Sequence, residues 1–163
     1  DPKIKENGIA LNISKWKKPA PDTIPWDTKA AGLYMINTLS KHEAEKDGFN
    51  DSMMLDSDGY VAEATGANVF FIDENKKEIH TPIPDCFLDG ITRRTIMEIA
   101  KDKGFNIIER KMNLDELNNF DACFLTGTAA EVTPVSQIGD YKFKVTPTIG
   151  ELFDKYLEIV NRT

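Results

Sequence analysis

Residues 52–72, SMMLDSDGYVAEATGANVFFI, hold the pattern that decides the fold. Three short runs rich in apolar, aromatic and β-branched residues are typical of strands, and they span Ser52 to Leu55, Tyr60 to Ala62 and Asn68 to Ile72. Between the first two runs stands Asp58-Gly59, a dipeptide that favours a tight hairpin turn. The stretch therefore predicts short paired strands at the centre of the chain.

Further strands and helices are predicted on both sides of this stretch. Strands are expected at 9–13, 77–80, 105–109 and 122–125, long helices at 30–48, 90–103 and 146–160, and a short helix at 114–117. In each long helix, apolar residues recur every three or four positions and form one face that can pack on a sheet. Because strands and helices are interleaved, the sequence predicts a mixed α/β domain.

Composition and charge exclude several classes of function. The 163 residues are 40% hydrophobic and 29% charged, which suits one globular domain with its own core. The net charge of -7 repels nucleic acid and anionic membranes, and no apolar run has the length of a membrane span. The two cysteines fit a reducing cytoplasm, and they and the two isolated histidines show no metal-like spacing, so no metal site is expected.

Two charged residues are candidates for chemistry. Lys29 follows a proline-rich connector, KKPAPDTIPW at 17–26, and small residues after it leave room for a flat ligand. A lysine in a pocket can attack a carbonyl carbon and form a Schiff base, whereas the alternative is a solvated lysine at a helix start. Glu63 leaves an apolar strand among small residues, where a carboxylate needs a cation such as a pyridinium nitrogen. Its alternative is a turn residue at the end of a hairpin.

Two turns are candidates for binding an anion. The first is LDGIT at 88–92, where free N–H groups at a helix start, Gly90 and the Thr92 hydroxyl suit a phosphate. The second is LTGTAAEVTP at 125–134, where a turn of small and hydroxyl residues presents several N–H groups. The first segment taken alone is better explained as an ordinary helix start, and the second is equally compatible with a tight turn between strands, so neither decides the function alone.

The order and wording of these motifs resemble the class IV aminotransferases, pyridoxal-phosphate (PLP) enzymes related to branched-chain and D-amino-acid aminotransferases. The resemblance runs from about Trp16 to Val160, and its most specific stretches are DGYVAEATGANVFFI, LDGITRRTI and LTGTAAEVTPV. It implies the large cofactor-binding domain of the fold type IV PLP enzymes, with a barrel-like, mostly antiparallel sheet and packed helices.

The resemblance also implies a role for each matching residue. Lys29 matches the Schiff-base lysine, Tyr34 the tyrosine that hydrogen-bonds the phenolic oxygen of the cofactor, and Glu63 the glutamate that keeps the pyridine nitrogen protonated. The other matches surround the cofactor: Leu88 at the ring, Gly90, Ile91 and Thr92 at the phosphate, and Thr128 and Ala129 at the phosphate and the substrate carboxylate.

The implied reaction is ping-pong transamination of branched-chain L-amino acids with 2-oxoglutarate, with PLP as cofactor. D-amino-acid aminotransferase and aminodeoxychorismate lyase remain alternatives, because Leu33, Ala67 and Asp89 stand where the family often has Asn, Glu and Pro. Amino-acid and 2-oxo-acid substrates, a homo-oligomer and a cytoplasmic location are expected, without a nucleic-acid or membrane partner.

The domain arrangement follows from the same resemblance. Residues 1–26 are expected to form an N-terminal strand and interdomain linker, and residues 27–163 the PLP-binding large domain. Family members carry a smaller N-terminal domain with a phosphate-binding arginine and part of the substrate pocket, and that domain is expected to be absent here. An inactive truncated domain is therefore a further alternative for the chain taken alone.

Overall fold

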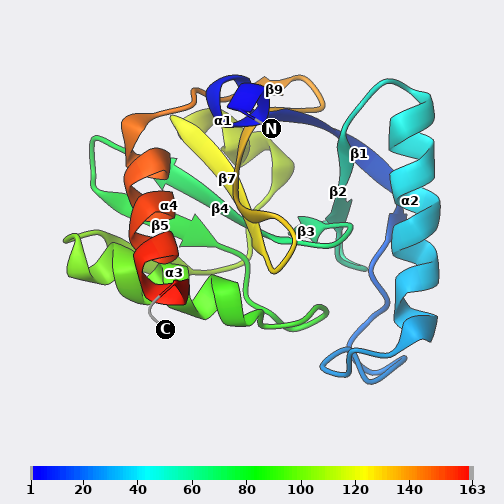
Figure 1. The fold of residues 1–163 in the computed structure, drawn as a ribbon. Helices are drawn as coiled ribbons and strands as arrows, with labels where there is room; N and C mark the ends of the chain where they lie inside the picture. The colour runs from blue at the N-terminus through cyan, green and yellow to red at the C-terminus, as the bar shows by residue number, and fades with distance from the viewer. Residues whose placement is uncertain (1, 162–163) are drawn as a thin grey trace.

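The computed structural model describes residues 2–161 and is built around one sheet (Figure 1). Its strands are β1 (Ile9–Lys17), β2 (Asp51–Leu55), β3 (Val61–Ala64), β4 (Asn68–Asp73), β5 (Glu78–Thr81), β6 (Asn106–Glu109), β7 (Ala122–Gly127), β8 (Glu131–Ile138) and β9 (Tyr141–Lys142). The α-helices are α1 (Pro2–Asn7), α2 (Tyr34–Lys46), α3 (Ile91–Asp102) and α4 (Pro147–Val160), and two 3-10 helices, η1 and η2, span Ala31–Leu33 and Leu114–Asn119.

The sheet is mixed and curls toward a barrel. Within residues 2–161 it has nine strands in the order β3-β2-β1-β8-β7-β4-β5-β6, with β9 paired to β8. Five of the eight strand pairs are antiparallel. Although β3 ends this path and β4 lies far along it, the backbone N–H of Ala64 donates to the carbonyl of Ala67 at 2.9 Å. The prediction of a mixed α/β fold with a curled, mostly antiparallel sheet is confirmed.

The alternation of side chains along β4 connects two hydrophobic clusters. Val69 and Phe71 belong to the cluster that also holds Leu11 of β1, and Phe70 belongs to the cluster beneath α3 and α4. Successive side chains of a strand point to opposite faces, so a strand buried on both faces needs an unbroken apolar run. The Phe70 ring stacks on Phe124 of β7 with 5.0 Å between centroids. The NVFFI run therefore forms an inner strand of the sheet.

The helices cover the sheet on two sides. Figure 1 shows α2 beside β1 and β2, while α3 and α4 lie together at the opposite end of the sheet. The helices predicted at 90–103 and 146–160 are confirmed, and the helix predicted from residue 30 is regular only from Tyr34, because residues 31–33 form η1. Within residues 2–161, no helix combines the length and apolar character needed to cross a membrane.

The sequence did not predict β8, which lies between β1 and β7 in the middle of the sheet. Its residues include Pro134, and proline is rare in inner strands because it has no N–H to donate. The structure tolerates it because the pairing of β8 with β1 begins only at Val135, one residue later. The strand thus keeps its ladder on the β1 side despite the proline.

Candidate functional site

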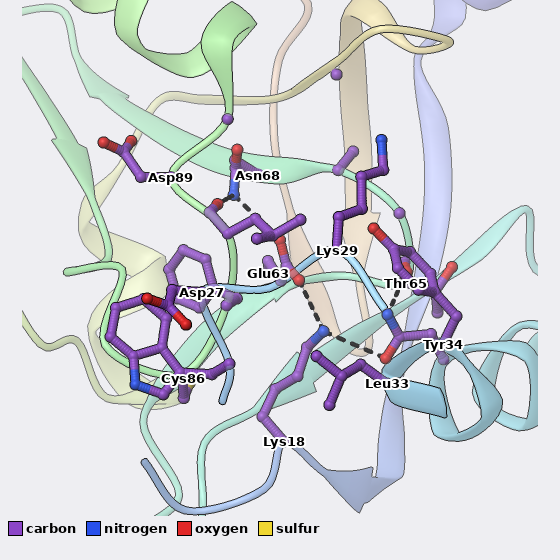
Figure 2. Close-up of a pocket in the computed structure, with 18 of the residues that line it drawn as sticks. Lys18, Asp27, Lys29, Leu33, Tyr34, Glu63, Thr65, Asn68, Cys86 and Asp89 are labelled. Atoms are coloured by element: carbon purple, nitrogen blue, oxygen red, sulfur yellow. Dashed lines mark hydrogen bonds and ion pairs between the residues drawn. The ribbon is translucent and has the colours of Figure 1, made fainter. Parts of the chain in front are cut away.

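A cavity of about 340 Å³ opens between four segments that are distant in sequence (Figure 2). They are the connector after β1 together with the start of α2, the turn between β3 and β4, the loop that leads into α3, and the turn between β7 and β8. Polar and charged side chains from all four segments line it. The antiparallel pairing of β4 with β7, in which Asn68 lies opposite Thr126, brings the β3–β4 turn and the β7–β8 turn to the same place.

Glu63 supplies a buried carboxylate to this cavity. The residue lies in β3, all of whose residues are buried, and it is 9% exposed. Its Oε1 accepts a hydrogen bond from Lys18 Nζ at 2.7 Å, and its Oε2 accepts one from Asn68 Nδ2 at 3.0 Å. Burial raises the pKa of Glu63 above its ordinary value, and Lys18 acts in the opposite direction. The site therefore holds a carboxylate whose charge depends on a cationic neighbour.

That neighbour, Lys18, was missed by sequence reasoning, which treated it as part of a connector. Its side chain is 6% exposed, and Nζ also donates to Asn37 Oδ1 of α2 at 3.2 Å (Figure 2). Asn37 in turn donates through Nδ2 to the carbonyl of Thr65 at 2.8 Å. The one available signal was indirect: a carboxylate predicted to be buried at Glu63 requires a cation from elsewhere in the chain.

Lys29 and Tyr34 lie on the segment that borders the same cavity. Lys29 is exposed and precedes η1, whereas Tyr34 is partly buried as the first residue of α2. Burial, followed by the negative charge of Glu63, raises the pKa of the Tyr34 phenol. Tyr34 is therefore a hydrogen-bond donor at neutral pH, and Lys29 is an amine with access to solvent and to the cavity.

The other end of the cavity offers unpartnered donors. The helix α3 starts after Gly90 without a side-chain cap, so the N–H groups of Ile91 and Thr92 have no partner within the helix. Across the cavity, the Thr126 hydroxyl is fully buried and has no hydrogen-bond partner among residues 2–161. Buried polar groups are rarely left without a hydrogen-bond partner. The free N–H groups at the start of α3 and the Thr126 hydroxyl therefore favour a bound anion between them.

Gly90, at the start of α3, packs closely against the side chain of Asn68 on β4. A Cβ atom at this position would lie 2.5 Å from Asn68 Oδ1, nearer than real Cβ contacts allow. Asn68 cannot easily move, because its Nδ2 donates both to Glu63 and to the carbonyl of Leu88 at 3.0 Å. Glycine is therefore needed for the close approach of the α3 start to β4.

The cavity brings together nearly all the residues that the sequence singled out. Its lining includes Lys29, Tyr34, Glu63, Leu88, Gly90, Ile91, Thr92 and Thr128, whereas Ala129 is not among its lining residues. The side chain of Ile91 is 76% exposed, so only its backbone is suited to the anion end. Leu33, Ala67 and Asp89, which depart from the family pattern, also line the cavity.

Arg93 fixes the loop before α3 through buried hydrogen bonds. The side chain is 1% exposed, and it donates to Asp89 Oδ1 and to Glu109 Oε2, both at 2.7 Å, and to the carbonyl of Pro82 at 3.1 Å. Asp89 alone would place a negative charge beside an anion site. Its pairing with Arg93 offsets that charge and fixes the loop on which the anion-binding groups stand.

Replacing Arg93 by methionine is expected to lower the free energy of unfolding by about 2 kcal/mol, because charge-assisted hydrogen bonds are lost while both carboxylates can rehydrate. Urea unfolding followed by circular dichroism measures the change. Arg94→Met is the control, since Arg94 is 59% exposed and 3.9 Å from Asp89, and its loss should be within about 0.5 kcal/mol. Equal losses in the two variants would contradict an anchoring role for Arg93.

The chain is similar in sequence to known proteins. The family model described as amino-transferase class IV matches residues 1–138. A probable branched-chain-amino-acid aminotransferase of Rickettsia felis is 43% identical over 154 residues, covering 94% of this chain and 52% of the relative. The branched-chain-amino-acid aminotransferase of Pseudomonas aeruginosa is 35% identical over 159 residues, covering 96% of this chain and 51% of the relative.

Solved structures show the same fold. The branched-chain amino acid aminotransferase of Thermobaculum terrenum in its PLP-form superposes with a TM-score of 0.89 at 31% identity, covering 97% of this chain and 53% of that one. The Escherichia coli branched-chain amino acid aminotransferase gives a TM-score of 0.91 at 31% identity, covering 98% and 53%. The chain spans about half the length of the curated relatives it matches.

Proposed function

The chain belongs to the class IV aminotransferases, and from this membership we propose that the whole protein is a PLP-dependent aminotransferase that passes the amino group of branched-chain L-amino acids to 2-oxoglutarate. The observation that carries the proposal is one cavity with a buried carboxylate, an accessible lysine and a helix start with free N–H groups. The relatives at 43% and 35% identity, both named as branched-chain enzymes, support this choice of substrate.

The residues of the cavity fit PLP. The free N–H groups of Gly90, Ile91 and Thr92, with Thr128 opposite, would bind the phosphate, and the orphaned Thr126 hydroxyl adds a donor nearby. The ring would lie against Leu88, with its nitrogen at the buried end of the cavity near Glu63 and its phenolic oxygen near Tyr34. Ala129, next to Thr128, is proposed for the substrate carboxylate through the backbone of this turn.

PLP, when bound, supplies the electron sink that makes the Cα proton of the amino acid removable. Lys29 Nζ would hold the cofactor at its aldehyde carbon and, when free as an amine, would take the proton from Cα of the substrate and deliver it to that aldehyde carbon. Glu63, as a carboxylate, would hold a proton on the ring nitrogen. Tyr34, whose raised pKa keeps the phenol protonated, would donate a hydrogen bond to the phenolic oxygen.

Substrate turnover separates this proposal from its alternatives. The whole protein, loaded with PLP and supplied with 2-oxoglutarate, is expected to use leucine with a kcat/KM on the order of 100-fold above that for D-alanine, as apolar pockets discriminate side chains. Aminodeoxychorismate should give no pyruvate. Faster turnover of D-alanine, or release of pyruvate from aminodeoxychorismate, would favour the corresponding alternative enzyme.

The assembly and location of the protein are proposed from its surface and its thiols. On α2, Met35 is 70% exposed and Leu39 is 49% exposed, and exposed apolar residues on one helix favour contact with another domain or subunit. We propose a homo-oligomer in which the other half of the protein also covers the cavity. Residues 27–163 would form the cofactor-binding domain, with residues 1–26 as its strand and linker. Cys86 and Cys123 are free and buried, consistent with a cytoplasmic protein.

A further inference from the structure

Both side chains of the ion pair between Lys18 and Glu63 are buried, and buried ion pairs are uncommon in proteins. The side chains are 6% and 12% exposed, and Nζ stands 2.7 Å from Oε1. Removing two charges from water is costly, and such a pair rarely stabilises a fold more than apolar residues of the same size would. Because both residues line the cavity, the pair points to a role in chemistry there.

We propose that Lys18 is a positioning residue whose ammonium keeps Glu63 ionised and oriented, so that Glu63 can hold the ring nitrogen of PLP protonated. The inference rests on the proposed function. It assigns to Lys18 a role that acts only through Glu63, since Lys18 would not itself touch the substrate or the reacting atoms.

The hydrogen bonds around Glu63 support an orienting role. Lys18 binds Oε1 and Asn68 binds Oε2, so the carboxylate is held at both oxygens. Each carboxylate oxygen has two lone pairs, which leaves acceptor capacity for a third donor such as a protonated ring nitrogen. With the plane of the carboxylate fixed in this way, its remaining lone pairs cannot turn away from the cavity.

Lys18 also connects Glu63 to the start of α2. Its Nζ donates to Asn37 Oδ1 at 3.2 Å, and Asn37 is tied by its Nδ2 to the carbonyl of Thr65. Asn37 is three residues after Tyr34 and therefore on the same side of α2. The Lys18 ammonium thus helps to fix the position of Glu63, expected at the ring nitrogen, relative to Tyr34, expected at the phenolic oxygen.

The ionisable groups around Glu63 make its charge dependent on Lys18. Burial raises the pKa of Glu63, Asp51 at the start of β2 raises it further, and Lys18 is the group that lowers it. Burial, followed by the negative charge of Glu63, raises the pKa of Tyr34 on α2, and burial with Asp85 raises the pKa of Cys86 in the loop before α3. Without the ammonium, burial and Asp51 would both favour the neutral form of Glu63, which cannot hold a proton on a pyridine nitrogen by charge.

The test is ¹⁵N NMR of PLP labelled at the ring nitrogen and bound to the whole protein, recorded across pH. In Lys18→Met, the ¹⁵N shift of the ring nitrogen should move toward its unprotonated value, because losing the ammonium 2.7 Å from Oε1 raises the pKa of Glu63, which then competes for the proton. Lys18→Arg keeps the charge and should retain the proton over the wild-type range. Lys17→Met is the matched control, because Lys17 is exposed, its Nζ donates to the carbonyl of Ser57, and it does not line the cavity.

The outcomes separate this inference from the proposed function. If the wild type binds no PLP or never protonates its ring nitrogen, the proposed function fails. If the wild type protonates it and Lys18→Met titrates identically, the function stands and the role of Lys18 is overturned. If Lys18→Met does not fold, the double variant Lys18→Met with Glu63→Gln decides. Recovered folding supports the ion pair, and continued unfolding shows that Lys18 acts by packing alone and overturns the inference.

Discussion

Lys29→Ala in the whole protein is expected to lower kcat for leucine by about 10⁴-fold or more, at the upper end of what one positioned acid–base group contributes, because Lys29 would also attach the cofactor. Folding should be unaffected, since the side chain is exposed and its removal leaves no cavity. The measurement combines steady-state kinetics with the visible absorption of bound PLP. The absorption typical of the lysine-bound cofactor should disappear.

Two controls accompany this variant. Lys15→Ala removes another exposed lysine, one that pairs with Glu43 outside the cavity, and it should leave kcat unchanged. An added small amine such as methylamine should restore part of the lost rate, because it can occupy the space of the missing ammonium. A Lys29→Ala protein that keeps wild-type turnover would exclude Lys29 as the catalytic lysine.

Glu63→Gln is expected to slow the half-reaction with leucine by about 10²–10³-fold, the scale of a lost electrostatic stabiliser. The amide is nearly isosteric, so the packing of β3 is preserved, but it carries no charge to retain a proton on the ring nitrogen. Rapid mixing of PLP-loaded protein with leucine measures the rate. Glu98→Gln on the exposed face of α3 is the control and should react at the wild-type rate.

The pH profile provides a second readout for Glu63. Burial raises the pKa of this carboxyl above 4.5, so the wild-type rate should fall as pH drops through the raised value and the carboxylate gains a proton. Gln cannot titrate, so this acid limb should be absent from the variant. Equal rates and identical profiles for the two proteins would leave Glu63 as a structural residue of the β3–β4 turn.

The sequence predicted those helices and strands whose hydrophobic pattern matches the faces that are buried in the structure. The apolar runs of β4 and the stripes of α3 and α4 specify their own structure, because periodicity reports directly on which faces are buried. β8 was missed since its proline and polar residues are unfavourable for an inner strand, and only the register with β1 makes them acceptable. The start of α2 was placed too early because η1 has the same short-range pattern as a helix.

The candidate site was predictable to the extent that its residues stand in recognisable motifs. Lys29, Glu63 and Thr128 were found in this way, and the fold brings them to one cavity. Lys18 was not, because its contact with Glu63 joins residues 45 positions apart and leaves no local pattern. The contact depends on the pairing of β1 with β2 and of β2 with β3, and no short stretch of the sequence specifies which strands pair.

The packing of Gly90 against Asn68 has a consequence for how this cavity can change by mutation. The amide of Asn68 donates to Glu63 and to the carbonyl of Leu88, and a Cβ atom at position 90 would collide with its oxygen, so positions 68 and 90 do not vary independently. A side chain at position 90 is compatible with the site only when residue 68 is shortened or reoriented in the same step, a case of strong epistasis between neighbours. A mutant library that varies one position at a time would therefore miss variants with a side chain at position 90, whereas randomising positions 68 and 90 together could recover them.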